Sequence, residues 1–135
     1  MEAAHVRQVE RIIGHKFSSD FLSQALVAAG AEQCGHDGNR KLSQLGASLV
    51  DVLVAIMVYD SSATKESIAN LRQQFAKKDH YVAAAKRTGI DRCIKYDQRP
   101  GAESPVVLRK ALNAIIAAVF LDTRDIMLTM HVTLR

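Results

Sequence analysis

The stretch NRKLSQLGASLV, residues 39–50, decides the fold class of this chain. A polar residue and a basic pair lead into a Leu-Gly pair, two small residues and an apolar run that continues to Tyr59. Leucines and isoleucines repeat along it at helical spacing, and valines make the opposite face nearly as apolar. A helix that is apolar on all sides is usually central and buried, so we predict a central helix over residues 40–59.

A second apolar segment, SPVVLRKALNAIIAAVFLD, predicts another central helix over residues 105–122, with Ser104 as its cap and Pro105 at its first position. Residues 90–104 are expected to form a polar loop, and the tail, residues 124–135, a partial helix or an extended arm. The sequence therefore predicts an all-α bundle with two central buried helices. Shorter helices are expected within 3–14, 18–30, 62–78 and 79–89, with Ser18 or Ser19, Thr64 and Asp79 as caps and Gly14, Gly30 and Gly89 as stops.

Length and composition limit the class of protein. The 135 residues, 48% hydrophobic and 24% charged, predict one folded domain over residues 1–135 and argue against disorder. A net charge of +4 is compatible with nucleic acid binding without requiring it. The first twelve residues fit neither a secretory signal nor a good transit peptide, and the longest apolar run, residues 49–58, is short and contains Asp51. We therefore expect no membrane partner and an intracellular protein, cytoplasmic, nuclear or mitochondrial.

Four segments, in order, carry a resemblance. Residues 39–50 resemble the signature of the ribonuclease III domain, whose usual form is Asn-Glu-Arg-Leu-Glu-Phe-Leu-Gly-Asp-Ser/Ala-Val-Leu. Residues 12–30 are similar to the first motif of that family, residues 81–99 to its short helix and following loop, and residues 107–122 to its closing motif. The match covers about residues 10–123 and implies the helical fold of this nuclease domain, here without a double-stranded RNA-binding domain.

The departures from the family pattern fall where its chemistry is carried out. The resemblance implies two pairs of carboxylates that gather Mg²⁺, but those positions hold Ser43, Ala47, Lys110 and Asn113. Mg²⁺ prefers anionic oxygen ligands in an octahedral arrangement. Two unit positive charges about 4 Å apart cost about 4 kcal/mol at an effective dielectric near 20, and a dication doubles that. We therefore expect no metal cofactor and no catalytic residues at these positions.

A rearranged metal site is the first alternative. Asp51 lies one turn beyond Ala47 on about the same helix face and is a weak candidate for holding one ion. Asp37 precedes the helix and could also approach, although a paired or solvated carboxylate is the simpler interpretation of both residues. His36 has no evident partner, and the remaining histidines show no metal spacing. Under this alternative the protein is a divergent Mg²⁺-dependent endoribonuclease that cuts double-stranded RNA.

The replaced residues also suggest how RNA could bind. Exchanging acids for basic side chains turns a cation site into a candidate phosphate site, suited to sequence-independent, salt-sensitive contact with A-form RNA. Solvated side chains that cover exposed helix ends are an equally good interpretation. The RNA-binding candidates are Arg40, Lys41, Arg109, Lys110 and Lys16, with Lys95 as a further contributor.

Pairing of two domains is the other property that the resemblance implies, because related domains pair across the first central helix. The aromatic residue that this contact uses in the family signature is Gln44 here, which puts the usual contact in doubt. A helix this apolar must still be covered by the domain itself or by a second copy. We expect a homodimer, or a heterodimer with another ribonuclease III-like chain, through Gln44, Leu45, Leu49 and Val52.

The leading hypothesis is a non-catalytic ribonuclease III-like domain that acts by binding RNA, a subunit, or both. The structural ribonuclease III-like proteins of fungal mitochondrial ribosomes are one form that it resembles. A dimerisation module that regulates an active ribonuclease III is a second alternative. The two cysteines, Cys34 and Cys93, lie far apart without a metal motif, and we expect ordinary thiols in a reducing compartment. Neighbouring basic residues could still lower the pKa of Cys93.

Overall fold

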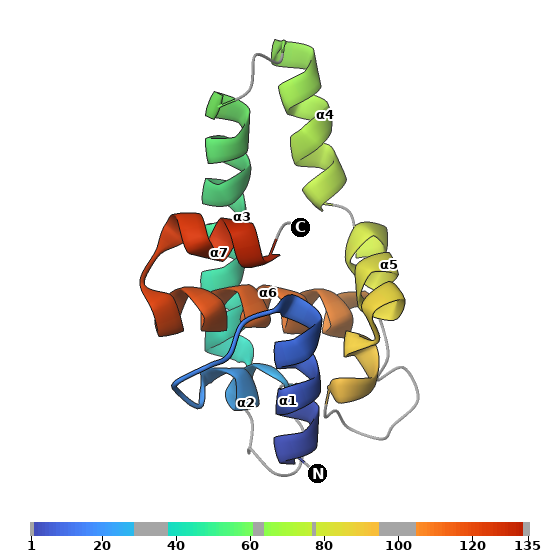
Figure 1. The fold of residues 1–135 in the computed structure, drawn as a ribbon. Helices are drawn as coiled ribbons and strands as arrows, with labels where there is room; N and C mark the ends of the chain where they lie inside the picture. Colours follow the sequence, from blue (N-terminus) through green and yellow to red (C-terminus); the bar gives the residue numbers. More distant parts are fainter. Residues whose placement is uncertain (1, 29–37, 61–63, 77, 95–104, 134–135) are drawn as a thin grey trace.

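A computed structural model describes residues 2–28, 38–60, 64–76, 78–94 and 105–133 of the chain. The regular elements in these ranges are all helical, which confirms the predicted all-α class (Figure 1). In chain order they are α1 (Glu2–Ile13), α2 (Phe21–Ala25), α3 (Arg40–Asp60), α4 (Lys65–Ala76), α5 (Lys78–Thr88), the 3₁₀ helix η2 (Ile90–Cys93), α6 (Pro105–Thr123) and α7 (Ile126–Thr133).

The two predicted central helices, α3 and α6, cross and make the most extensive contact in the domain (Figure 1). The crossing is close because Gly46 lies directly against the backbone of Asn113. A Cβ atom at Gly46 would lie 1.8 Å from the carbonyl oxygen of Asn113, so the contact is possible only without a side chain there. The distance between the two helices is therefore set by one glycine.

Three of the remaining helices, α2, α5 and α7, pack on α6. Contacts of α6 with α2, α5 and α7 enclose a core that includes Leu22, Ala85, Ala114 and Ala118, all fully buried. α1 closes this core through Val9, which is also fully buried, and it contacts η2. Small side chains on α6 let several helices approach it at once, which explains why so alanine-rich a helix is central.

The second half of α3 differs from the prediction. The helix was expected to be buried along its whole length, but its last buried residue is Val54, and Tyr59 is 88% exposed. Figure 1 shows this half extending beyond α6, with α4 returning beside it. α4 begins after the predicted cap, since the backbone N–H of Ser67 donates to the Thr64 hydroxyl at 3.2 Å. Packing against α6 therefore buries only the part of α3 that the crossing reaches.

Several predicted boundaries were wrong. α2 is only five residues long and begins after Asp20, because the hydroxyls of Ser18 and Ser19 bond to another helix instead of capping it. α5 begins before Asp79, which therefore lies inside the helix and not at its cap. Gly14 and Gly89 end their helices in the left-handed conformation, as predicted. Gly30 and Ser104 lie outside the described residues.

The loop and tail predictions changed in a similar way. The start of the predicted polar loop is the 3₁₀ helix η2, with Ile90, Cys93 and Ile94 buried. Of the predicted partial helix and extended arm, the structure shows the helix: α7 packs back on α6 and buries Thr129 and Val132.

By length and composition α3 is long enough to cross a membrane, and it is the one helix among the described ranges for which this holds. The apolar run of residues 49–58 is short, but the helix that contains it has 21 residues. The core helix of a folded domain passes the same test, and the first half of α3 packs against α6.

Candidate functional site

The start of α3 is held in place by a buried asparagine. Asn39 is 1% exposed, and its side-chain N–H donates to the carbonyl oxygen of Ala25 at 3.0 Å. Gly38 precedes it with a φ of +45° and lies against the carbonyl groups of Val27 and Ala28. These contacts explain the Asn at the beginning of the signature: it fixes where α3 starts relative to the chain that follows α2.

The crossing of α3 and α6 brings the four family positions to one place. The contact between Gly46 and Asn113 lies within the turn of α3 that carries Ser43 and Ala47, and within the turn of α6 that carries Lys110. Positions separated by three or four residues on one helix share a face. These residues therefore lie on the turns of α3 and α6 that meet at the crossing.

Burial divides the four positions into two pairs. Ser43 is 7% exposed and Asn113 4% exposed, so both are buried, whereas Ala47 and Lys110 are exposed. The Oδ1 atom of Asn113 is buried without a hydrogen-bond partner. The inner pair is thus uncharged, and the only charge that these four residues bring is the Lys110 ammonium.

These residues do not fit a divalent metal ion. Mg²⁺ requires hard oxygen ligands, usually with one or two carboxylates. Ser43 and Asn113 offer neutral oxygens, Ala47 offers none, and Lys110 adds a positive charge that opposes a dication. Throughout the part of the chain that the structure describes, no group of three His, Cys, Asp or Glu side chains is arranged to hold a metal.

Asp51, the candidate for a rearranged site, lies on the exposed face of α3. It forms no hydrogen bond or ion pair with any of the described residues. A single exposed carboxylate can bind Mg²⁺ only weakly, because it supplies one of the several ligands needed. His36 and Asp37, the other candidates, lie outside the described residues.

The basic candidates do not form one group. Arg40, Lys41 and Lys110 are exposed on α3 and α6, whereas Arg109 is half-buried. Lys16 is exposed beside His15, which is bonded to Asp122 near the end of α6. The twelve residues from Lys110 to Asp122 span roughly 18 Å of helix, so Lys16 lies far from the crossing. Lys95 lies outside the described residues.

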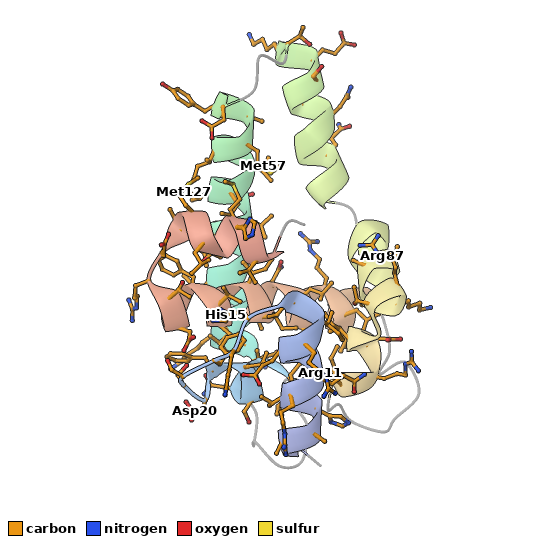
Figure 2. The ribbon with its side chains drawn as sticks, in the orientation of Figure 1. Arg11, His15, Asp20, Met57, Arg87 and Met127 are labelled. Carbon is orange, nitrogen blue, oxygen red and sulfur yellow. The ribbon has the colours of Figure 1, made fainter. Side chains whose placement is uncertain are left out.

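The expected dimer residues have different surroundings. Gln44 is exposed and Val52 is 47% exposed, so both are available for contact with a second molecule. Leu49 is 8% exposed and Leu45 half-buried, and both pack in the core of their own domain. Because the two leucines pack inward and Gln44 is exposed, the outward face of α3 is more polar than the sequence alone suggested. Figure 2 shows Met57 further along α3, on the half that extends beyond α6.

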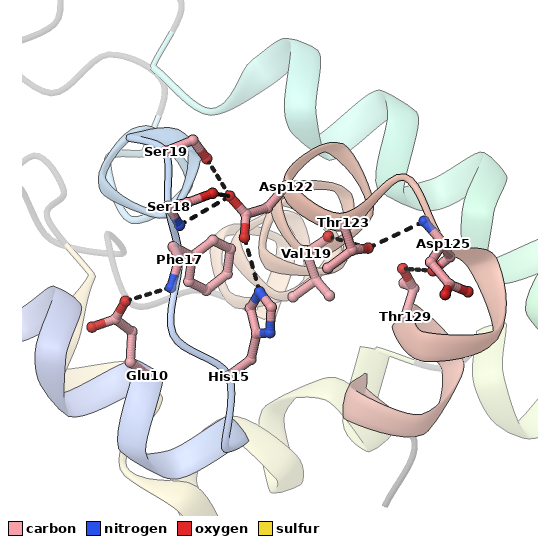
Figure 3. A network of polar contacts seen from close by, with 10 residues as sticks. All are labelled: Glu10, His15, Phe17, Ser18, Ser19, Val119, Asp122, Thr123, Asp125 and Thr129. Atoms are coloured by element: carbon pink, nitrogen blue, oxygen red, sulfur yellow. Dashed lines mark hydrogen bonds and ion pairs between the residues drawn. The ribbon is translucent and has the colours of Figure 1, made fainter.

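A polar network that the sequence did not indicate lies at the far end of α6. Asp122 accepts four hydrogen bonds from residues 15–19 (Figure 3): from His15 Nε2 at 3.0 Å, from the N–H and the hydroxyl of Ser18 at 3.1 Å each, and from the Ser19 hydroxyl at 2.8 Å. Burial acts to raise the pKa of Asp122, but hydrogen bonds from His15, Ser19 and Ser18 outweigh it and hold the pKa below its usual value.

This network fixes the segment between α1 and α2 to the end of α6. The Asp122 side chain is only 5% exposed, so its ionised form depends on these donors. Glu10 adds a further contact, accepting from the N–H of Phe17 at 2.7 Å. The match of Asp122 to the closing motif was the available sequence signal, but its partners lie more than a hundred residues away in the chain.

Cys93 is an inert thiol in this structure. It is 1% exposed, and burial, followed by the charge of Asp91, raises its pKa, with Arg92 acting in the opposite direction. The thiolate is the reactive form, so raising the pKa lowers reactivity. Arg92 does lower this pKa, as suggested, but burial and Asp91 outweigh it and the net shift is upward, which fits an ordinary thiol at Cys93. Cys34 lies outside the described residues.

Comparison with known proteins supports this description. No family model matches the chain. Ribonuclease 3 of Phenylobacterium zucineum is 31% identical over 131 residues, covering 89% of this chain, and ribonuclease 3 of Cereibacter sphaeroides is 28% identical over 124 residues, covering 87%. The chain spans 54% of the length of each of these relatives.

The structural comparison agrees with these sequence relatives. The nuclease domain of ribonuclease III from Campylobacter jejuni superposes with a TM-score of 0.81 and 20% identity, covering 96% of this chain and 94% of that one. This similarity shows that the two chains share a fold. The sequence relatives and the structural neighbour together support the ribonuclease III nuclease-domain family for this chain.

Proposed function

We propose that this chain is a non-catalytic ribonuclease III-like domain that acts by binding RNA, a partner subunit, or both. The proposal rests on which residues stand at the family's metal-binding positions, on the turns where α3 and α6 cross. Ser43, Ala47, Lys110 and Asn113 meet there without a carboxylate among them, and two of the four are buried and neutral.

The chemistry of phosphodiester hydrolysis explains why this content matters. Cleavage by metal ions requires the metal to activate water and to offset the charge that develops at phosphorus. The protein must supply the anionic ligands that hold the metal in position. With a lysine and three uncharged residues at these positions, the domain keeps the frame of a nuclease and loses the means to hold its metal.

Assembly through α3 is the second part of the proposal. The C. jejuni nuclease domain is described as having a region involved in dimer formation. In this chain Lys41, Gln44, Ser48 and Val52 form an exposed stripe along α3. We propose that this stripe contacts a second copy or another ribonuclease III-like chain, and that the paired domains present their basic residues to structured RNA. A structural protein of a large ribonucleoprotein particle, such as a mitochondrial ribosome, is one form of this role.

The direct test is a single incubation. Purified protein is mixed with duplex RNA and Mg²⁺ or Mn²⁺, and both cleavage and gel retardation are scored, with an active ribonuclease 3 as the positive control. Retardation without cleavage is the expected result.

Two other results would change the proposal. Cleavage that disappears in Asp51→Ala would establish the divergent endoribonuclease instead. The absence of both cleavage and retardation, together with stable pairing to an active relative, would establish the regulatory dimerisation module.

A further inference from the structure

We infer that the Lys110 ammonium takes the place of the divalent cation at the α3–α6 crossing, so that RNA phosphate binds there without metal and Mg²⁺ competes with the protein. This inference rests on the proposed RNA binding and adds how that binding responds to divalent ions. It also follows from the poor fit of this site to a metal.

The position of Lys110 is fixed by the crossing. Asn113 lies one turn later on α6, with its backbone against Gly46 of α3. The Lys110 side chain is exposed and forms no ion pair with the described residues. Its charge is therefore exposed on α6 one turn before the crossing and is available to a ligand.

The neighbouring family positions leave the charge of Lys110 uncancelled. Asn113, one turn later on α6, and Ser43 on α3 are both buried and neutral, and the Oδ1 atom of Asn113 has no hydrogen-bond partner. Carboxylates at the same positions would instead pair with the lysine and cancel it.

The charges on α3 near the crossing are positive in sum. The first turn of α3 contains no acidic residue and begins with Arg40 and Lys41. The positive end of the α3 dipole adds to these charges. Asp51 lies one turn beyond Ala47, roughly 6 Å along the helix, and opposes them with one negative charge. Arg40, Lys41, Lys110 and Asp51 together still carry a net charge of +2, which favours an anion over a dication.

With this arrangement, added Mg²⁺ should weaken RNA binding and not support it. A protein that neutralises phosphates with lysine displaces the cations condensed on the nucleic acid, so added cations weaken its binding. Mg²⁺ then acts as a competitor for the phosphate that Lys110 contacts, and chelation of Mg²⁺ leaves binding intact.

The experiment measures the anisotropy of a labelled short RNA duplex, titrated with the full chain in EDTA and in Mg²⁺ at equal ionic strength. We expect binding in EDTA at least as tight as in Mg²⁺. Lys110→Gln should weaken binding about fivefold in EDTA and reduce the slope of log affinity against log salt by about one. Lys86→Gln, which changes an exposed lysine of α5, is the matched control and should bind like the wild type.

The outcomes separate the two proposals. RNA binding that requires Mg²⁺, or Lys110→Gln binding like the wild type, overturns the inference while RNA binding itself stands. No binding in either buffer at low salt overturns the proposed RNA binding as well. A second measurement uses the electron paramagnetic resonance signal of free Mn²⁺, which should be unchanged by the protein, and a stoichiometric loss of that signal also overturns the inference.

Discussion

Gly46 is the residue on which the central crossing depends most directly. Replacing it with alanine would place a Cβ atom 1.8 Å from the backbone oxygen of Asn113, and backbone on α6 cannot move aside as a flexible side chain would. We expect Gly46→Ala to lower the free energy of unfolding by about 3 kcal/mol or more, or to prevent folding. Urea denaturation would measure the loss. Ala47→Ser, at the exposed neighbouring position, should change stability by less than about 0.5 kcal/mol.

The lowered pKa of Asp122 predicts that the free energy of unfolding depends on pH. Its folded pKa is lowered, so the stability it contributes is present above its unfolded pKa and is lost as pH falls through the lower, folded value. Asp122→Asn removes the ionised acceptor of His15, Ser18 and Ser19, and should cost about 1–3 kcal/mol at pH 7. The difference between wild type and variant should shrink below about pH 4. Chemical denaturation at pH 7, 5 and 3 measures this, and a constant difference would contradict the assigned role.

For single residues, the sequence predicted which residues stand at the site better than it predicted their burial and contacts. Matching the signature identified Ser43, Ala47, Lys110 and Asn113, and the structure brings these four together. Nothing in the local sequence indicated which of them are buried, because burial depends on how α6 crosses α3. The partners of Asp122 could not be predicted for the same reason, since hydrogen bonds between distant segments leave no periodic pattern.

At the scale of elements, the link between α6 and α7 contains a strained residue. Arg124 has a φ of +53°, the one positive value among the described non-glycine residues, and its N–H donates to the carbonyl oxygen of Phe120. Asp125 then caps α7 by accepting from the N–H of Leu128 at 3.1 Å. Figure 3 shows Thr123 and Asp125, which flank Arg124 in this link. This short connection is what turns the chain back over α6.

Because the backbone of Arg124 is strained, replacing this residue with glycine should stabilise the domain. Glycine adopts the left-handed conformation without the penalty of a Cβ atom, so Arg124→Gly should raise the free energy of unfolding by about 0.5–1 kcal/mol. Arg124→Ala removes the same side chain and keeps the Cβ atom, and it should give no gain. Thermal unfolding of the three proteins distinguishes release of backbone strain from loss of the arginine side chain. An equal gain in both variants would contradict the backbone explanation.

Elements with strong apolar periodicity were predicted well, and those that depend on polar contacts were not. α3 and α6 follow from helical spacing, because burial against many neighbours requires that pattern. α2 was predicted too long because Ser18 and Ser19 match the residues that cap helices. In the structure their hydroxyls satisfy Asp122, which the sequence does not show. Whether a serine caps a helix therefore depends on whether its hydroxyl has another hydrogen-bond partner in the fold.

At the scale of the whole molecule, α3 makes a testable prediction about assembly. Val52 is 47% exposed on the stripe proposed to contact a second chain. We expect the wild type to sediment as a dimer at micromolar concentration and Val52→Glu to sediment as a monomer with an unchanged far-ultraviolet circular dichroism spectrum. A carboxylate in the centre of an interface between two copies is unpaired and costly.

A control variant makes the interpretation specific. Val106→Glu changes a valine that is 39% exposed near the start of α6, away from the stripe, and should remain a dimer. A wild-type protein that is monomeric at every concentration would contradict assembly through α3. The comparison of Lys110→Gln with the wild type in the RNA experiment can be made in either assembly state, because the crossing lies within one chain.

Because Cys93 is buried, the rate at which its thiol reacts measures local unfolding of the domain. Cys93 is the last residue of η2, and its buried thiol, with a raised pKa, can react with a reagent such as iodoacetamide only when η2 moves away from the core. Its labelling rate, followed by peptide mass spectrometry that separates it from Cys34, should be slow in buffer and rise steeply at the urea concentration where the helices separate. Rapid modification in buffer would mean that η2 opens far below the threshold for global unfolding.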